Sequence, residues 1–196
     1  MIGLTFAISN ASLIQSLKMA IDHSLDKALA ADIVITSSEQ LSSRSNHFSD
    51  AVAASIASMD DVAAADRIRI TTTRMNDREV ALLAHDMSEF FRISPDLLDT
   101  GDPARARELT SRGEGVVISN NLALRSNLKL GDSLTIRSPK GDLALPIVGM
   151  LDYYRSEHGT IFLERALYRQ YWDDPDVDYI FIDLKPGVDR QAFKAK

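Results

Sequence analysis

The chain of 196 residues contains no cysteine. It can therefore form no disulfide bond, no thiolate metal site and no cysteine nucleophile. The absence of thiols does not by itself fix the compartment in which the protein works.

Long apolar runs are also absent. No stretch reaches the roughly 20 apolar residues that a helix needs to cross a bilayer. The apolar octet 1–8 is too short, and it lacks the basic residues that open a signal peptide. Two interpretations of this octet stay open, namely the buried first turn of a soluble helix and the cut end of a membrane helix.

The sequence lacks an excess of positive charge, because 22 basic residues face 28 acidic ones and the net charge is −6. Binding to nucleic acid requires Lys and Arg concentrated on one face. The basic residues are instead scattered, and only two groups come close together, Arg67/Arg69 and Arg105/Arg107/Arg112. The charge pattern therefore argues against a nucleic-acid partner.

Signatures of catalysis and of metal binding are missing as well. The chain has neither the Gly-x-Ser-x-Gly of a nucleophile elbow nor a phosphate-binding P-loop. Its histidines, His23, His47, His85 and His158, are too far apart for a helical metal pair. Ser119 follows a predicted strand, where it suits a helix N-cap better than a nucleophile. We expect no catalytic, cofactor or metal residues; a hydrolase built from distant residues would need a histidine near Ser119 or near a carboxylate pair.

Alternating apolar and polar residues make 115–152 the most informative stretch. The pattern predicts three strands, at 115–119, 133–137 and 143–150, and one helical turn at 120–128. Asp132 and Asp142 each follow a glycine at a corner, where glycine accepts a positive φ and aspartate bonds the backbone. We interpret both aspartates as turn residues and not as a catalytic pair.

The rest of the chain alternates helices and strands. Leucine and isoleucine recur every four residues through 10–30, at Leu13, Leu17, Ile21, Leu25 and Leu29, which predicts a helix about 30 Å long. Further strands are expected at 31–37, 62–73, 79–84, 159–163 and 177–184, and helices at 48–59, 104–112, 164–172 and from 188 onward. The Ile-Val-Ile run at 33–35 predicts burial on both faces in a sheet interior.

These elements predict an α+β fold with a discontinuous organisation. Residues 31–84 read as a small layer that needs one more strand, and 177–184 is the candidate for it. We therefore expect one α+β subdomain over 31–85 and 176–196, with a β-rich subdomain over 86–175 inserted between its strands.

Aromatic residues gather toward the end of the β-rich part, at Tyr153, Tyr154, Phe162, Tyr168, Tyr171 and Trp172. The favoured interpretation is a small aromatic core. The alternative is a contact for a partner subunit through Tyr153, Tyr154, Tyr171 and Trp172, because exposed Tyr and Trp are frequent anchors.

Five segments in order carry a resemblance to a known family: GVVISNNLA (115–123), LKLGDSLTI (128–136), SPKGDLALPIVGMLDYY (138–154), GTIFLERALYRQYW (159–172) and PGVD (186–189). Together they resemble the extracytoplasmic domain of FtsX-like ABC transporter permeases, the MacB-type periplasmic core domain. The resemblance implies that 31–85 with 176–196 is porter-like, that 86–175 is sabre-like, and that 1–30 is a stalk helix continuing from a membrane helix.

The same resemblance implies a function without catalysis. The domain would stand on the outer side of the cell membrane and couple ATP hydrolysis to export or to extracytoplasmic signalling. Its implied partners are a cytoplasmic ATP-binding subunit, a second permease copy in a dimer, and a lipoprotein, peptide or lipid cargo. The alternative is a stand-alone peptide- or lipid-binding or adaptor module, which a deep apolar pocket would favour.

Overall fold

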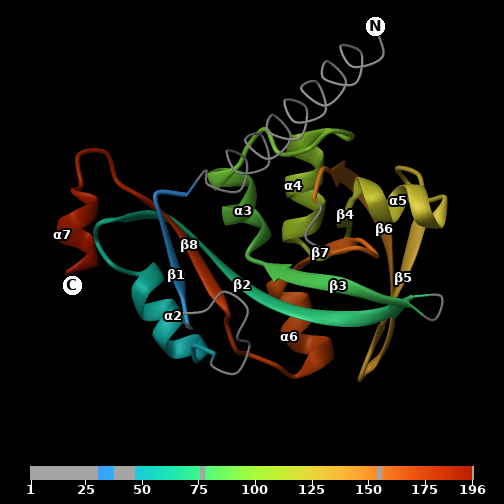
Figure 1. Ribbon diagram of the computed structural model, residues 1–196, viewed down its shortest axis with the longest axis horizontal. Helices are drawn as coiled ribbons and strands as arrows, with labels where there is room; N and C mark the ends of the chain where they lie inside the picture. Colours follow the sequence, from blue (N-terminus) through green and yellow to red (C-terminus); the bar gives the residue numbers. More distant parts are fainter. Residues whose placement is uncertain (1–30, 38–46, 76–77, 154–155, 196) are drawn as a thin grey trace, which may run out of the picture. The chain divides into compact units, whose positions relative to one another are not determined.

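Eight strands form one sheet in the part of the chain that the computed structural model describes, residues 31–37, 47–75, 78–153 and 156–195. The octet 1–8, the helix expected over 10–30 and Tyr154 lie outside the described residues. The strand order is β1-β8-β2-β3-β7-β4-β6-β5 (Figure 1). The expected α+β class is confirmed.

The strands are β1 (Ile33–Thr36), β2 (Val62–Met75), β3 (Arg78–His85), β4 (Val116–Ser119), β5 (Ser133–Ser138), β6 (Gly141–Leu151), β7 (Thr160–Glu164) and β8 (Tyr179–Leu184). The helices are α2 (Asp50–Ala57), α3 (Met87–Ile93), α4 (Pro103–Ser111), α5 (Asn120–Ser126), α6 (Arg165–Trp172) and α7 (Arg190–Lys194). All strands and helices predicted between residues 31 and 196 are present, with ends that differ by a few residues.

Strand β2 joins two parts of the sheet, the pair β1 and β8 on one side and the strands from β3 to β5 in the sheet order on the other. Its first part pairs with β8, from Val62 to Ile68, and its second part pairs with β3, from Arg69 to Met75. Strand β8 also pairs with β1, so the prediction that 177–184 supplies the missing strand is confirmed.

The prediction that the run 33–35 lies in the interior of a sheet with both faces buried was wrong. This strand pairs with β8 at one end of the described sheet and is not an interior strand. Ile33 is buried, whereas Val34 is 39% exposed. A run of β-branched residues suits a strand with one buried face as well as a central strand, so residue type alone did not report the position in the sheet.

The antiparallel pairing of β1 with β8 places Ile33 opposite Ile182. Asp32, just before β1, accepts a hydrogen bond from the N–H of Leu184 at 2.9 Å and pairs with Arg190 of α7. This end of the two strands is therefore held by side chains as well as by the ladder.

Both faces of the sheet are covered around β3. Alternate residues of β3 point to opposite faces. Val80 and Leu82 enter a core that also contains Leu122 of α5 and Tyr168 of α6, the α6-side core. Leu83 enters another core with Phe90 of α3, Ala106 of α4 and Phe162 of β7, the α3-side core. Helices α3 and α6 therefore cover opposite faces.

A third core, the β8 core, gathers residues of β1, α2, β8 and α7, namely Ile33, Ala53, Ile180, Ile182 and Phe193 with their neighbours. All of its members come from 31–85 and 176–196. Strand β3 lies within the same range but packs into the α6-side and α3-side cores. The division into two subdomains stays a prediction.

Two glycines occupy backbone conformations that other residues rarely adopt. Gly141, the first residue of β6 after the turn from β5, has φ +122°, as its sequence position suggested. Gly159, before β7, has φ +99°, and a Cβ added there would lie 2.4 Å from Cβ of Leu122. Gly141 has no atom within 4 Å of an added Cβ.

We predict that Gly159→Ala destabilises the chain by roughly 2–5 kcal/mol, because backbone strain and overpacking against α5 add together. Gly141→Ala is the control and should cost only about 1–2 kcal/mol, from strain alone. Urea denaturation of both variants measures the difference. Equal losses in the two variants would contradict the close packing of Gly159 against Leu122.

Candidate functional site

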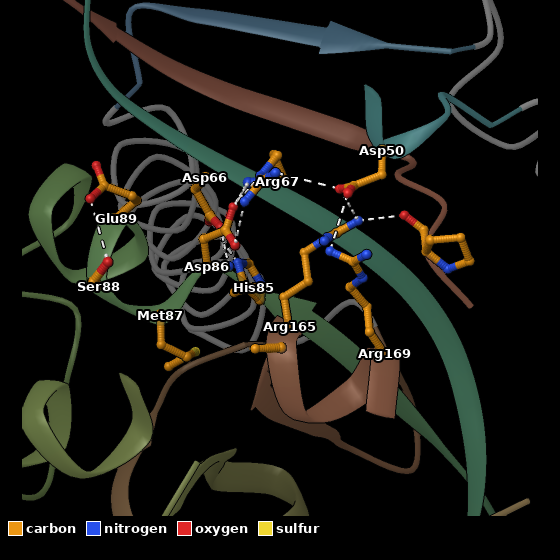
Figure 2. A network of polar contacts seen from close by, with 12 residues as sticks. Asp50, Asp66, Arg67, His85, Asp86, Met87, Ser88, Glu89, Arg165 and Arg169 are labelled. Atoms are coloured by element: carbon orange, nitrogen blue, oxygen red, sulfur yellow. Dashed lines mark hydrogen bonds and ion pairs between the residues drawn. The ribbon is translucent and has the colours of Figure 1, made fainter. Parts of the chain in front are cut away.

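Polar side chains gather where two parallel strands end together. Strands β3 and β7 are parallel neighbours, and His85 at the end of β3 is paired with Glu164 at the end of β7. The chain continues from β3 into α3 and from β7 into α6. Antiparallel β2 brings Asp66 and Arg67 to the same place. We call the resulting group the junction network: Asp50, Asp66, Arg67, His85, Asp86, Glu164, Arg165 and Arg169. Figure 2 labels all of these residues except Glu164.

Arg67 attaches the start of α3 to β2. Its Nε donates to Oδ2 of Asp86 at 2.6 Å, and its Nη2 donates to Oδ1 at 3.1 Å. This two-bond geometry is the strong form of an arginine–carboxylate pair. The hydrogen bond to Asp86 raises the pKa of Arg67, so the arginine keeps its charge at this half-buried position.

Asp50, in the first turn of α2, faces three arginines (Figure 2). Its carboxylate lies 3.1 Å from Nη2 of Arg165, 3.1 Å from Nη1 of Arg169 and 3.4 Å from Nη1 of Arg67. Arg165 is only 2% exposed, and this burial lowers its pKa. Arg165 also donates to the carbonyl of Pro175. One carboxylate thus joins α2, β2 and α6.

His85 and Asp66 form a buried pair. Nδ1 of His85 lies 2.7 Å from Oδ2 of Asp66, and Oδ1 of Asp66 accepts the N–H of Asp86 at 3.0 Å. The imidazole ring lies 4.6 Å from the ring of Phe90, centroid to centroid. Burial raises the pKa of Asp66. The partner that orients His85 is therefore Asp66, not the adjacent Asp86, and the pair is enclosed by the core.

Glu164 contacts the starts of two helices. Oε2 accepts the N–H of Met87 at 3.1 Å, and Oε1 accepts the N–H of Ala166 at 3.2 Å. Burial raises the pKa of Glu164 to about 7, although the two hydrogen bonds from backbone N–H groups favour the ionised form and act in the opposite direction.

An open pocket of about 460 Å³ lies beside the junction network. Its polar lining comes from Arg67, Asp86, Glu89 and Glu164 with three serines, and its apolar lining is Val62 and five alanines of α2 and β2. Three carboxylates and one arginine make this a polar pocket, unlike the deep apolar cavity that would hold a lipid.

A second polar group surrounds Arg69 of β2. Its Nε donates to Asp174 at 2.8 Å and its Nη1 donates to Asp178 at 3.0 Å. Nδ1 of His47 lies 2.8 Å from Oδ1 of Asp178, and Asp174 accepts from the hydroxyl of Tyr168 at 2.8 Å. The basic pair Arg67 and Arg69, close together in the sequence, is thus committed to carboxylates of the same domain.

The other residues considered for chemistry have structural roles. Ser119 is fully buried at the N-cap position of α5, but its Oγ accepts the N–H of Thr160 at 2.8 Å and does not cap the helix. Asp132 accepts the N–H of Lys129 at 2.8 Å and closes its turn as predicted, whereas Asp142 lies in β6 opposite Arg137. In the described ranges, no group of three or more His, Asp or Glu residues could hold a metal ion.

The aromatic residues do not form one cluster. Tyr153 packs on the α3-side core, with its ring 5.2 Å from that of Phe162. Tyr171 and Trp172 pack on the α6-side core, and Trp172 stacks on Tyr168 at 5.0 Å. These two cores lie on opposite faces of the sheet. A partner contact through Tyr153, Tyr154, Tyr171 and Trp172 stays a prediction.

Comparison with known proteins identifies the class of this domain. The sequence profile of the MacB-like periplasmic core domain matches residues 1–196, so the chain belongs to that family. The family consists of extracytoplasmic domains of ABC transporter permeases, which are membrane proteins, and the resemblance seen in the sequence is confirmed.

Among individual proteins, an uncharacterized ABC transporter permease protein of Mycobacterium tuberculosis is 31% identical over 81 residues. That match covers 41% of this chain and 10% of the length of the permease.

Two solved structures share the fold. The periplasmic region of MacB from Actinobacillus actinomycetemcomitans has a TM-score of 0.61 at 10% identity, covering 83% of this chain and 78% of that one. The extracellular domain of the noncanonic ABC-type transporter YknZ from Gram-positive bacteria has a TM-score of 0.56 at 11% identity, with coverage of 83% and 86%. None of the helices in the described segments is long and apolar enough to cross a membrane.

We predict that Asp50→Asn lowers the free energy of unfolding by roughly 1–3 kcal/mol, because it leaves the buried Arg165 without its carboxylate. The partly exposed position of Asp50 keeps the loss below that of a fully buried pair. The control is Glu108→Gln, which breaks the exposed pair with Arg112 and should cost less than about 1 kcal/mol.

Chemical denaturation at low and high salt measures both variants. A loss for Asp50→Asn as small as that for Glu108→Gln would show that the junction network does not hold the domain together.

Proposed function

We propose that the chain is a non-catalytic extracytoplasmic domain of an ABC transporter permease. In this proposal it transmits the movement of membrane helices, driven by ATP hydrolysis in a cytoplasmic subunit, to export or to signalling outside the cell. Membership of the MacB-like family over the whole chain is the observation that carries the proposal.

The internal construction supports a transmitting role. Strand β2 pairs with β8 on one side and with β3 on the other, and the junction network joins α2, β2, α3 and α6. A domain tied in this way moves as one body, because bending it at the junction would separate buried charges from their partners. A rigid body passes displacement at one end to the other.

The partners follow from the same proposal. Residues 1–196 contain no P-loop, and in this proposal a cytoplasmic ATP-binding subunit supplies the energy. A second permease copy forms a dimer, and the cargo is a lipoprotein, a peptide or a lipid. Shifting the equilibrium between two arrangements of such a dimer from 1:99 to 99:1 requires the interaction free energies of the two arrangements to change by about 5.5 kcal/mol relative to each other. The apolar stripe from Leu13 to Leu29 is our candidate for that contact.

A cysteine cross-link in the full-length permease tests this proposal. The domain has no cysteine of its own, so Leu17→Cys introduces a single thiol into it on the apolar stripe. We expect a disulfide between two copies at this position to reduce export at least tenfold and a reducing agent to restore it, because the two domains can no longer move relative to each other.

Gln15→Cys is the matched control, because in the helix predicted from the sequence over 10–30 two residues correspond to a rotation of about 200° and the apolar stripe does not include it. It should form little disulfide and leave export unchanged. Full export with Leu17 cross-linked would contradict the transmitting role, as would turnover of a substrate by the purified domain alone.

A further inference from the structure

The open pocket of about 460 Å³ beside the junction network carries more negative than positive charge. Three carboxyl groups line it, those of Asp86, Glu89 and Glu164. Its described lining contains one guanidinium, that of Arg67. Arg67 already binds Asp86 through two hydrogen bonds and lies 3.4 Å from Asp50. Its charge is therefore neutralised within the domain, and the other two carboxyl groups give the pocket an excess of negative charge.

Glu164 is held in the orientation of a carboxylate, without a cation beside it. Its Oε2 lies 3.1 Å from the backbone N of Met87 and its Oε1 lies 3.2 Å from that of Ala166. Both hydrogen bonds favour the ionised form of the side chain. Glu164 forms no ion pair with any described residue, and Glu89 has a long contact of 3.6 Å with the exposed Arg92. The pocket is thus prepared for a positive charge that the described residues do not supply.

The serines of the lining add acceptors to these carboxylates. Ser58 and Ser111 each donate the hydroxyl proton to a backbone carbonyl three or four residues earlier, at 2.9 Å and 2.6 Å. Ser88 donates to Oε1 of Glu89 at 3.4 Å (Figure 2). A serine hydroxyl has one proton to donate and two lone pairs, so each oxygen can still accept a hydrogen bond. The lining therefore suits a ligand that is rich in donors.

The rest of the lining is apolar and consists of small side chains. Five alanines and Val62 belong to it, from α2 and the first part of β2. Small side chains leave room for an alkyl chain, and long cationic side chains bury their stems against such a surface while the charged head stays among polar groups. Because the pocket is open, a side chain can enter it while the backbone that carries the side chain stays outside.

We propose that this pocket binds an arginine side chain of a partner polypeptide, with the alkyl stem against the alanines and the guanidinium directed toward Glu89 and Glu164. A guanidinium has five N–H donors and no acceptor, which complements a lining made mostly of acceptors. Its charge complements the two carboxylates, and such charge-assisted hydrogen bonds are the strong ones. The pocket rests on the fold alone; only the identity of the polypeptide, as cargo or as partner subunit, rests on the proposed function.

The tripeptide Ac-Gly-Arg-Gly-NH2 is the probe, and Ac-Gly-Cit-Gly-NH2 is its control, because citrulline has the length of arginine without the charge. Both are titrated into the 196-residue chain at pH 8, where Glu164 with its pKa of about 7 is ionised. With the arginine peptide, the NMR signals of the Met87 and Ala166 amides should shift with a dissociation constant of roughly 1 mM. The citrulline peptide should bind at least about tenfold more weakly.

Two variants locate the binding site. Ala54→Leu fills the pocket from an exposed position of α2 without changing any charge, and it should weaken binding at least about tenfold. Glu89→Gln removes one carboxylate and should weaken binding about twofold to fivefold. Asp142→Asn is the control, because it removes an exposed carboxylate of β6 that is not part of the lining, and it should leave the affinity unchanged.

The titration of Glu164 gives a second measurement that needs no variant to fold. A cation beside an acid favours the ionised form, so the arginine peptide should lower the pKa of Glu164, followed through its carboxyl carbon resonance. The citrulline peptide should leave that pKa where it is.

Equal binding of the two peptides, or unchanged binding in both Ala54→Leu and Glu89→Gln, would overturn the proposal. Propylguanidinium carries the same head group without a backbone; if it binds as tightly as the arginine peptide, the pocket takes a free small cation and the role of a polypeptide is wrong. None of these results bears on the transmitting role, which the cross-link at Leu17 tests separately.

Discussion

The arrangement of this domain depends on β2 changing partners halfway along its length. A single strand of 14 residues pairs with β8 over its first part and with β3 over its second. Around that change the strand places Asp66, Arg67 and Arg69, and each meets an oppositely charged or hydrogen-bonding group from another element. The hydrogen-bond ladder gives continuity along the sheet, and the ion pairs fix the helices that leave it.

Burying charge at such a point is costly unless every charged group finds a partner. Asp50 meets this requirement for three arginines, and Asp178 does so for Arg69. Ion pairs of this kind add less to stability than a packed apolar core would, but they accept few alternative arrangements. We infer that they specify how α2, α3 and α6 sit on β2, as the transmitting role that we propose would require.

The elements of the fold were predictable because their signals are local. Alternation identified β5 and β6, and the corner residue Gly141 has the positive φ that its turn needs. Neither polar group was predictable, because Arg67 and Asp86 of the junction network are 19 residues apart and Arg69 and Asp178 of the second group are 109 apart. Tyr153 and Trp172 are aromatic residues of one part of the sequence yet pack on opposite faces of the sheet, because Tyr153 follows β6 whereas Trp172 belongs to α6, and residue type does not report the face.

The pairing of β1 with β8 has a mechanical consequence. Because the two strands are antiparallel neighbours, the start of β1 and the end of β8 lie at the same end of the pair, where Asp32 binds the N–H of Leu184. Tension pulling these two flanks apart would unzip the ladder one rung at a time, instead of shearing all rungs together. Asp32 stands at the first rung, so its two bonds set the load at which the edge of the sheet begins to peel.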